Sequence, residues 1–583
     1  MEYLLAIALG PVQEFIATAR RTRDLYAGSR LLSEAAGAAA SALVGEVKPQ
    51  GLIFPAPESQ EDLKVLGKAG IPNVLLVRVP PGKDPASLGE KALEAARDHL
   101  RRRAEAVFSK EPLRRRVKQE VALAQVEDLL EGYYAYVPLE GGYRQARERV
   151  MALLAARKNT RDFAPVAWGG PEYKSSLDGA RESVLVGLED ALRLRLGLRE
   201  GEYLSGPDLL KRGWGSETGF VSTLHMAAMP FLEGVRRAGK EEVLRQGLRE
   251  LAGLAGEGAR ARVDHPALRD TPFRDWDVRL LYESRLEEFP DLAGSRERLE
   301  AAQRRLRALL QELGVGTPFP YYALLHADGD RMGEAINCQE TPEAHRALSR
   351  KLALEFAQEV GPLVEGRGGG LVYSGGDDVL ALLPLHNALR AAWALAERFR
   401  QVMAAFGAPG SAPSLSVGLA VVHQLEPLQD ALELVRRAEK LAKEGWKGEA
   451  KRNALGVVYS PRSGAEVWAR GRWDETPRLT QRLLRYADLL RAGEVPSRAA
   501  YELRQLVQEA KGFLSDEALV AEALRLLGRK EMRPQYREEL KSWLRTGRDV
   551  ERLATELILA RPFAEAMELA GLPVESREVW DAH

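Results

Sequence analysis

Short apolar runs alternate with longer amphipathic stretches in the first part of the chain. The apolar runs have the length and composition of strands, and the stretches between them carry apolar residues at helical spacing. The strand-like runs are Glu2–Leu9, Gly51–Phe54, Val74–Val79 and Tyr133–Leu139, and helical patterns run through Leu31–Ala40 and over Ala86–Phe108. This order predicts a first α/β unit in residues 1–140.

A second unit of similar order follows from residue 317. Pro320–Ala327 predicts a buried strand, and the apolar runs Leu371–Tyr373 and Val379–Leu383 flank a tight turn, which predicts a β-hairpin. The remaining elements are expected at Met332–Ala335, Pro342–Leu363, Asn387–Phe406 and Leu428–Lys443 as helices and at Ser414–His423 as a strand. The order of strand, helices, hairpin, helix, strand and helix is typical of a ferredoxin-like or palm domain.

The rest of the chain has mainly helical patterns, rich in Arg, Glu and Leu before the second unit and in Leu and Ala after it. We therefore predict an α/β (α+β) protein with two ferredoxin-like palm domains. The first palm is placed at 1–140, a mainly helical insertion at 141–316, the second palm at 317–465, and a helical C-terminal domain, without strands, at 466–583. At roughly 150 residues per domain, the length of 583 residues suits this division.

The composition of the chain excludes several classes of protein. The 84 basic and 84 acidic side chains cancel, which argues against attraction of polyanions by the chain as a whole. A single cysteine, Cys338, excludes a disulfide framework and a cysteine-based zinc cluster, and it favours a reducing, cytoplasmic compartment. The start has no basic segment and no apolar run is long enough for a membrane helix, so we expect neither a signal peptide nor a membrane partner.

The candidate chemistry lies in the hairpin turn, Ser374-Gly375-Gly376-Asp377-Asp378. Its glycines permit positive φ and the close approach of a phosphate, so Ser374, Gly375 and Gly376 are candidate nucleotide contacts. In a regular strand Asp377 and Asp378 would point to opposite faces, but a turn can bring both toward one cation. The alternative is a plain turn, because Gly and Asp are common turn residues.

A further acidic group, Asp328-Gly329-Asp330, ends the preceding strand. Asp328 is the expected third metal ligand, Gly329 a close-approach position, and Asp330 a weaker candidate that can instead cap the next helix. Carboxylates of this kind suit Mg²⁺ or Mn²⁺, two of which can activate a hydroxyl and stabilise leaving pyrophosphate. Asp328, Asp377 and Asp378 are thus the predicted catalytic and metal-binding residues.

Cations and imidazoles lie near these carboxylates in the predicted fold. Lys440 and Lys443 are three apart on one helical face and can hold triphosphate oxygens, although most lysines on such a helix are solvated. His326 and His423 are candidate metal or base residues, with a packed histidine as the alternative.

Several of these segments together resemble one known family. They are residues 10–16 (GPVQEFI), 19–29 (ARRTRDLYAGS), 31–33 (LLS), 328–333 (DGDRMG), 375–378 (GGDD), 416–420 (SVGLA) and 442–443 (AK). In this order they resemble the large palm-domain subunit of type III CRISPR effector complexes, in its Cmr (type III-B) branch. GGDD alone would also suit a GGDEF-like cyclase.

The resemblance implies a concrete activity. In the family, two palms face each other and bind two ATP molecules, GGDD coordinates the metals, and a 3′-hydroxyl attacks an α-phosphate to build cyclic oligoadenylate. The implied partners are the other Cmr subunits, guide RNA and target RNA, which switches synthesis on. Gly28 and Ser29, near Arg20, Arg21 and Arg23, become candidate nucleotide or RNA contacts in the first palm. A non-catalytic nucleotide-binding scaffold and a GGDEF-like cyclic dinucleotide synthase stay open as alternatives.

The sequence departs from the family pattern at two places. Many members carry an N-terminal HD nuclease domain, but here the first-palm block starts by residue 10 and no His-Asp dipeptide occurs, so we expect no DNase in this chain. Many members also carry two Cys-x-x-Cys pairs. The matching segments, Lys174–Gly179 and Leu204–Arg212, have Ser and Asp instead, so we expect no zinc there. The arginine runs Arg101–Arg103 and Arg114–Arg116 are either RNA contacts or ordinary helix surface.

Overall fold

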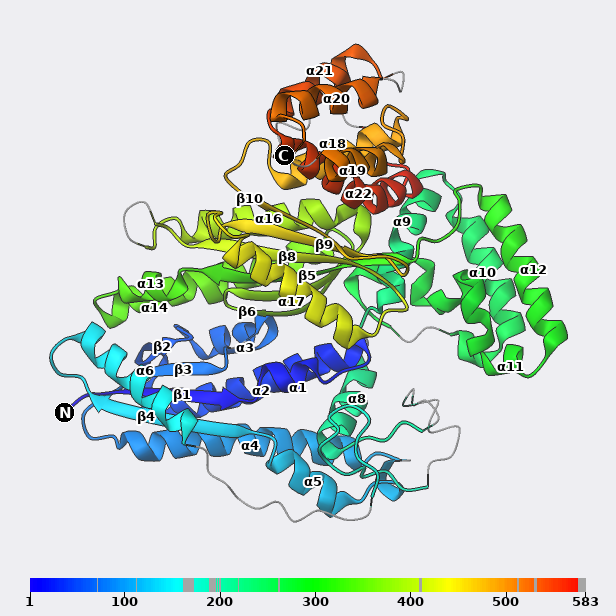
Figure 1. Ribbon diagram of the computed structural model, residues 1–583. Helices are drawn as coiled ribbons and strands as arrows, with labels where there is room; N and C mark the ends of the chain where they lie inside the picture. Colours follow the sequence, from blue (N-terminus) through cyan, green and yellow to red (C-terminus); the bar gives the residue numbers. More distant parts are fainter. Residues whose placement is uncertain are drawn as a thin grey trace.

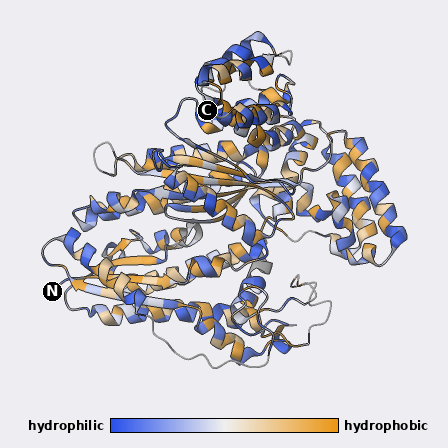
Figure 2. Ribbon diagram, in the orientation of Figure 1, coloured by the Kyte–Doolittle hydropathy of each residue, from blue (hydrophilic) through white to orange (hydrophobic). Residues whose placement is uncertain are grey.

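The computed structural model describes residues 1–583 apart from 71, 112, 161–171, 188–195, 197, 199–200, 219, 261–262, 408–410, 511–512, 529–531 and 575–583. Two sheets lie one above the other in Figure 1, with a helical group beside the upper sheet and another above it. Figure 2 shows apolar residues concentrated in the strands and on the inner sides of the helices. Among the described residues, no helix has both the length and the apolar composition needed to cross a membrane.

The first sheet forms from alternating apolar segments near the start of the chain. β1 (Tyr3–Gly10) lies antiparallel between β3 (Val74–Val79) and β4 (Glu131–Pro138), and β2 (Leu52–Phe54) pairs with β3. The helices around it are α1 (Gln13–Ala17), α2 (Thr22–Val47), α3 (Gln60–Ala69), α4 (Pro85–Phe108) and α5 (Gln119–Glu127). These strands and helices confirm the first predicted α/β unit.

One helix of this unit lies beyond the predicted boundary at residue 140. α6 (Tyr143–Asn159) packs on β1 and β4, where Ala146, Val150 and Leu154 join a core with Leu4. The first palm therefore continues through α6, and the boundary at 140 is wrong. A helical pattern reveals which face of the helix is apolar, but not which sheet that face will cover.

The second sheet has the strand order β10-β9-β8-β5-β7-β6. Its strands are β5 (Tyr321–Asp330), β6 (Gly370–Gly375), β7 (Asp378–Leu383), β8 (Ser414–His423), β9 (Ala454–Ser460) and β10 (Val467–Arg472). All neighbours are antiparallel except β8 and β9. The prediction of helices alone after residue 465 is wrong, because β10 adds to the sheet edge. Its segment, VWARGR, is short and partly charged, so only its pairing with β9 makes it a strand.

Helices cover both faces of this sheet. They are α13 (Met332–Asn337), α14 (Pro342–Arg350), a π-helical segment η8 (Lys351–Phe356), α15 (Ala357–Glu365), α16 (Leu385–Met403) and α17 (Leu428–Glu444). Ala323, Leu325 and Ala327 of β5 share a core with α16, whereas Tyr322 and Leu324 point to the face that α17 covers. The alternation along β5 therefore decides which of its polar residues face α17.

The insertion packs against both palms. α8 (Gly206–Thr218) contacts α2, α4 and α5 of the first palm, whereas α9 (Thr223–Arg237) contacts β5 and α16 of the second. α10 (Glu241–Ala255), α11 (Pro290–Ala293) and α12 (Arg296–Leu313) complete it at the right of Figure 1. The C-terminal helices are α18 (Leu479–Arg491), α19 (Ala499–Ala510), α20 (Asp516–Gly528), α21 (Pro534–Trp543) and α22 (Gly547–Leu569).

Polar contacts join the two palms. Arg346 of α14 donates hydrogen bonds to the carbonyl oxygens of Pro49 and Pro57 at 3.1 and 2.8 Å. The hydroxyl of Tyr143 on α6 lies 2.6 Å from Nδ1 of His345 on α14. Since an uncharged imidazole nitrogen can accept a hydrogen bond from a tyrosine hydroxyl, this contact suits neutral His345.

The contact at His345 predicts loss of stability in acid. Burial, and then the positive charge of Arg147, lower the pKa of His345 from 6.5 to about 4. Unfolded chains therefore bind a proton below pH 6.5 that the folded protein excludes, so stability falls as the pH drops from 6.5 toward 4. Between pH 7 and pH 5 we expect His345 to contribute a loss of about 2 kcal/mol.

Urea unfolding at several pH values measures this loss. His345→Gln can still accept from Tyr143 but does not titrate, so the variant should lose about 2 kcal/mol less than the wild type between pH 7 and pH 5. Equal pH slopes for the two proteins would contradict the prediction.

Candidate functional site

The SGGDD segment forms the tip of a β-hairpin that lies beside the first palm. Gly375 at the end of β6 pairs with Asp378 at the start of β7, so Gly376 and Asp377 form a two-residue turn. Gly376 has φ +82°, which glycine adopts without strain and which such a turn requires at its first position. The predicted hairpin is confirmed, and its turn carries the acidic pair.

Asp328, near the end of β5, and Asp378, at the start of β7, lie on neighbouring strands. Ala327 pairs with Val379 across β5 and β7, which places Asp328 and Asp378 at the next facing positions. His326, two residues before Asp328, points to the same face, and its Nε2 lies 3.0 Å from an oxygen of Asp378. The structure thus brings Asp328 and Asp378 to one edge, on the face that α17 covers.

Asp377 lies on the other face of the hairpin end. A β-carbon placed on Gly329 of β5 would lie 2.7 Å from Cβ of Asp377. The absence of a side chain at Gly329 therefore leaves the room that the Asp377 side chain occupies beside β5. Burial, with a smaller effect from the Asp378 carboxylate, raises the pKa of Asp377 to about 6. A nearby cation would favour its charged form.

The carboxylates of Asp328, Asp377 and Asp378 are therefore not arranged to bind one metal ion by themselves. Within the part of the chain that the structure describes, no group of three or more His, Cys, Asp or Glu side chains is placed to hold a metal ion. Mg²⁺, however, usually binds proteins through one or two carboxylates and takes its other ligands from water and substrate phosphates. The donor set of Asp328, Asp377 and Asp378 fits such a cation in its chemistry.

Lys443 of α17 neutralises Asp328. Its ammonium group forms an ion pair with the Asp328 carboxylate and lies 3.2 Å from Glu439. Burial raises the pKa of Glu439 to about 7. Lys440, predicted on the same face, is 69% exposed and lies 3.9 Å from Glu444. Of these two lysines, Lys443 is therefore the one that contacts Asp328.

Asp330 is held inside the fold. Its carboxylate accepts hydrogen bonds from the hydroxyls of Ser414 and Ser416 at 2.8 and 2.9 Å and from the backbone N–H of Asn453 at 2.9 Å. The expected helix-capping role is wrong, because the N-cap of α13 is Arg331 and no side chain caps it. Asp330 instead holds the loop that follows α17.

Gly28 and Ser29 are buried in α2. A β-carbon on Gly28 would lie 3.2 Å from Cδ of Lys211 and 3.5 Å from Cα of Ile16, so close packing accounts for the glycine. A nucleotide contact of Gly28 and Ser29 stays a prediction. The nearby arginines hold the insertion, since Arg20 and Arg23 donate to the carbonyl oxygens of Ser176 and Leu196.

Several residues that complete the site have no role that the sequence predicts. Tyr373 of β6 lies with its hydroxyl 3.2 Å from Asp378, and Gln13 of the first palm also contacts Asp378. Arg452 and Asn453, both with positive φ, bring the loop after α17 back to Lys443. Gln13 stands in the GPVQEFI segment, but nothing local indicates that it reaches the second palm.

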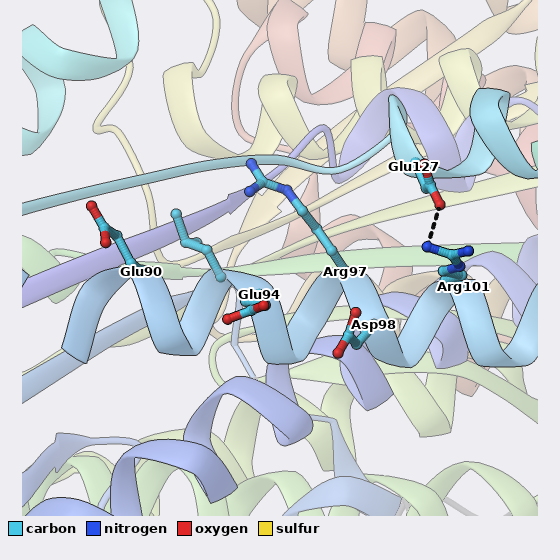
Figure 3. Close-up of a pocket in the computed structure, with 7 residues that line it drawn as sticks. Glu90, Glu94, Arg97, Asp98, Arg101 and Glu127 are labelled. Atoms are coloured by element: carbon cyan, nitrogen blue, oxygen red, sulfur yellow. Dashed lines mark ion pairs between the residues drawn. The ribbon is translucent and has the colours of Figure 1, made fainter. Parts of the chain in front are cut away.

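A hollow of about 470 Å³ over α4 lies apart from these residues. Figure 3 shows its lining of Glu90, Glu94, Arg97, Asp98, Arg101 and Glu127, in which Arg101 pairs with Glu127 at 3.1 Å. Four carboxylates face two guanidinium groups, so this lining does not favour a phosphate. Arg103 pairs with Glu34 at 3.0 Å, so two members of the 101–103 run are engaged with acids.

The segments expected to lack zinc carry a hydrogen-bonded group of four side chains. Ser175 and Asp178, and likewise Ser205 and Asp208, are three residues apart. The hydroxyl of Ser175 donates to Asp208 at 2.6 Å, and that of Ser205 lies 2.9 Å from oxygens of both Asp178 and Asp208. Buried Lys211 pairs with Asp208 at 3.1 Å. Hydrogen bonds and an ion pair therefore connect the two segments at this place.

We predict that this group stabilises the insertion without metal. Ser205→Ala removes one of the hydroxyl donors that Asp178 and Asp208 share, and it should lower the free energy of unfolding by about 2 kcal/mol. EDTA should leave the thermal unfolding of the wild type unchanged, and the exposed Ser542→Ala serves as the matched control. A chelator-dependent loss of stability that persists when Asp377 and Asp378 are replaced by asparagine would indicate a metal in the insertion and contradict the prediction.

The fold and the hairpin define a protein with two palm domains. Residues 4–109 match the family described as CRISPR-associated protein Cmr2, N-terminal, and residues 321–456 match Cas10/Cmr2, second palm domain. These two segments are therefore similar to the N-terminal domain and the second palm domain of Cas10/Cmr2 proteins. This confirms the resemblance to the large palm-domain subunit of type III-B complexes.

Relatives and solved structures agree with this assignment. The CRISPR system Cmr subunit Cmr2 of Pyrococcus furiosus is 30% identical over 263 residues, which cover 40% of this chain and 29% of that protein. The chain thus aligns with less than a third of that relative's length. A type III-B Cmr-beta structure in the apo state matches with a TM-score of 0.63 at 14% identity, covering 91% of this chain and 77% of the other. The Cmr-beta complex bound to cognate target RNA matches at 0.60 and 13%, covering 91% and 79%, respectively. These two likenesses confirm the predicted two-palm fold.

Proposed function

We propose that this protein converts ATP to cyclic oligoadenylate by metal-dependent nucleotidyl transfer. The observation that carries the proposal is the GGDD hairpin, whose Asp378 faces Asp328 at the end of β5 beside the first palm. Its partners would be the other Cmr subunits, guide RNA and a target RNA that switches synthesis on, as in a guide-directed antiviral complex. The matched relatives, one of them solved with target RNA, support these partners. A cytoplasmic location is part of the same proposal.

The residues around the hairpin suit the transfer of a nucleotidyl group. Asp328, Asp377 and Asp378 would hold Mg²⁺ or Mn²⁺, which neutralises phosphate charge and activates the attacking hydroxyl when it is bound. A β-carbon on Gly375 would meet nothing within 4 Å, so a phosphate has room to approach the backbone there. Phosphoryl transfer depends mainly on positioning and charge neutralisation, and these residues would supply the first directly and the second through the cation that they hold.

Lys443 would contribute to nucleotide binding by leaving Asp328 and contacting the triphosphate. Its ammonium group now pairs with Asp328, and burial lowers its pKa. If a metal neutralised Asp328, Lys443 would be free to contact the triphosphate of the same nucleotide. Lys440 would contribute only a solvated charge one turn earlier on α17.

The experiment that tests the proposal uses the protein assembled in its guide complex, with labelled ATP and Mg²⁺ or Mn²⁺. Products are resolved by mass with and without matching target RNA. Target-dependent cyclic oligoadenylate is the expected result. A failure to form any oligomer under all of these conditions would overturn the proposal.

The Lys443–Asp328 ion pair also favours a second candidate, a nucleotide-binding scaffold that does not turn over. In such a protein the lysine would permanently replace the cation that catalysis requires. ATP binding without any product would support the scaffold. A cyclic dinucleotide made from GTP would instead support a GGDEF-like synthase.

A further inference from the structure

The first palm contacts the GGDD hairpin through several elements, and two of these contacts lie on either side of the turn. At the end of α3, a β-carbon placed on Gly70 would lie 2.4 Å from the carbonyl oxygen of Ser374, so the backbones of the two palms touch there. At the start of α1, the side-chain amide of Gln13 reaches Asp378, with Nε2 and Oδ2 3.5 Å apart. The first contact is at Ser374, just before the two glycines, and the second is at Asp378, just after the turn.

Gln13 also contacts a second element of the other palm. Arg436 of α17 donates a hydrogen bond from Nη2 to Oε1 of Gln13 at 2.9 Å. Because a guanidinium group can only donate, the amide oxygen must face Arg436 and the amide nitrogen is left to donate to the Asp378 carboxylate. Gln13 therefore joins the hairpin to α17, the helix that also carries Lys443.

The residues around Asp378 make this link consequential. The Tyr373 hydroxyl donates to Asp378 from 3.2 Å, and Nε2 of His326 lies 3.0 Å from the same carboxylate oxygen. A change at Gln13 would leave Asp378 to Tyr373 and His326 alone. Gln13 would then no longer help to orient the Asp378 carboxylate toward Asp328.

The segment that carries Gln13 is itself firmly held. Buried Lys211 of α8 donates to the carbonyl oxygen of Phe15 at 3.0 Å and to that of Thr18, and it pairs with Asp208 at 3.1 Å. Gly28 leaves the space that the Lys211 side chain occupies. The position of Gln13 is thus determined by the insertion and by α2.

We infer that Gln13 is a positioning residue for Asp378, through which the first palm orients the catalytic hairpin of the second. The inference rests on the proposed function for its consequence in catalysis. Its structural content, a bridge from α1 to both Asp378 and Arg436, does not. Any relative displacement of the palms would act on Asp378 through this amide.

The test uses the full chain with Gln13→Ala, Gln13→Glu, Arg436→Ala and the double variant Gln13→Ala/Arg436→Ala. The first readout is the affinity for Mn²⁺ in the presence of a non-hydrolysable ATP analogue, measured by electron paramagnetic resonance. We expect Gln13→Ala to weaken Mn²⁺ binding about fivefold, since one carboxylate is less well oriented. Gln13→Glu also removes the amide donor but adds a negative charge that attracts the cation, so it should bind Mn²⁺ no more weakly than Gln13→Ala.

The second readout is the rate of oligoadenylate formation in the assembled complex. Gln13→Ala should lower kcat about tenfold and change KM for ATP by less than about twofold, because orientation rather than ground-state binding is lost. The double variant should be no worse than the more impaired single variant, since both substitutions break one bridge. Gln145→Ala and Arg437→Ala, at other surface positions, are the matched controls.

The outcomes separate this inference from the proposed function. Wild-type levels of Mn²⁺ binding in Gln13→Ala would overturn the inference, as would losses in the two single variants that multiply in the double variant. If the wild type forms no product, the proposed function fails, and the Mn²⁺ titration still decides the role of Gln13. Because Gln13 is exposed, its variants should unfold within about 2 °C of the wild type.

Discussion

Replacing Asp377 and Asp378 together with asparagine should abolish the synthesis of oligoadenylate, with a loss of about 10³-fold or more. Asparagine keeps the size of the side chain and much of its hydrogen bonding, but it removes the negative charge that holds a divalent cation. Asp378 would still accept from Tyr373 as an amide, so the hairpin should keep its shape. The measurement is the yield of labelled product, resolved by mass, in the assembled complex with target RNA.

A matched control makes the loss interpretable. Asp430→Asn changes an exposed carboxylate on α17, away from the hairpin, and should leave product formation unchanged. Thermal unfolding of the double variant should match that of the wild type. Product formation within about tenfold of the wild type would remove these two carboxylates from the mechanism, since a lost electrostatic stabiliser costs more than that.

The second large effect concerns stability. Asp24→Ala should lower the free energy of unfolding by about 3–5 kcal/mol, because it leaves the buried charge of Arg212 without its closer partner. Arg212 of α8 has no exposed surface and pairs with Asp24 of α2 at 2.8 Å and with Glu202 at 3.3 Å. Urea unfolding measures the change.

Two comparisons test the reason for this loss. Asp98→Ala removes an exposed carboxylate from α4 and should change stability by less than about 0.5 kcal/mol. Asp24→Asn keeps a hydrogen-bond acceptor, so its free energy of unfolding should lie between those of Asp24→Ala and the wild type. If Asp24→Ala were as stable as Asp98→Ala, the ion pair that joins the insertion to the first palm would contribute nothing.

Local pattern predicted much of the fold because its signals lie within a few residues. The apolar run before Asp328 and the glycines of the turn indicated β5 and the hairpin, and Figure 1 labels β5 and β6 in the second palm. Where a segment depends on its neighbours, the prediction failed. β10 is a strand because β9 pairs with it, and α6 belongs to the first palm because of the sheet that it covers.

By itself, the sequence determined the order of most strands and long helices in the two palms, the hairpin turn, and the chemical character of the site as acidic with nearby lysines. These follow from periodicity and from residue types, which are local properties. Only the tertiary structure decided that Asp377 and Asp378 lie on opposite faces, that Lys443 rather than Lys440 meets Asp328, and that Gln13 reaches across from the first palm. Such contacts join residues that are distant in the sequence, and they depend on how whole elements pack, which local patterns do not predict.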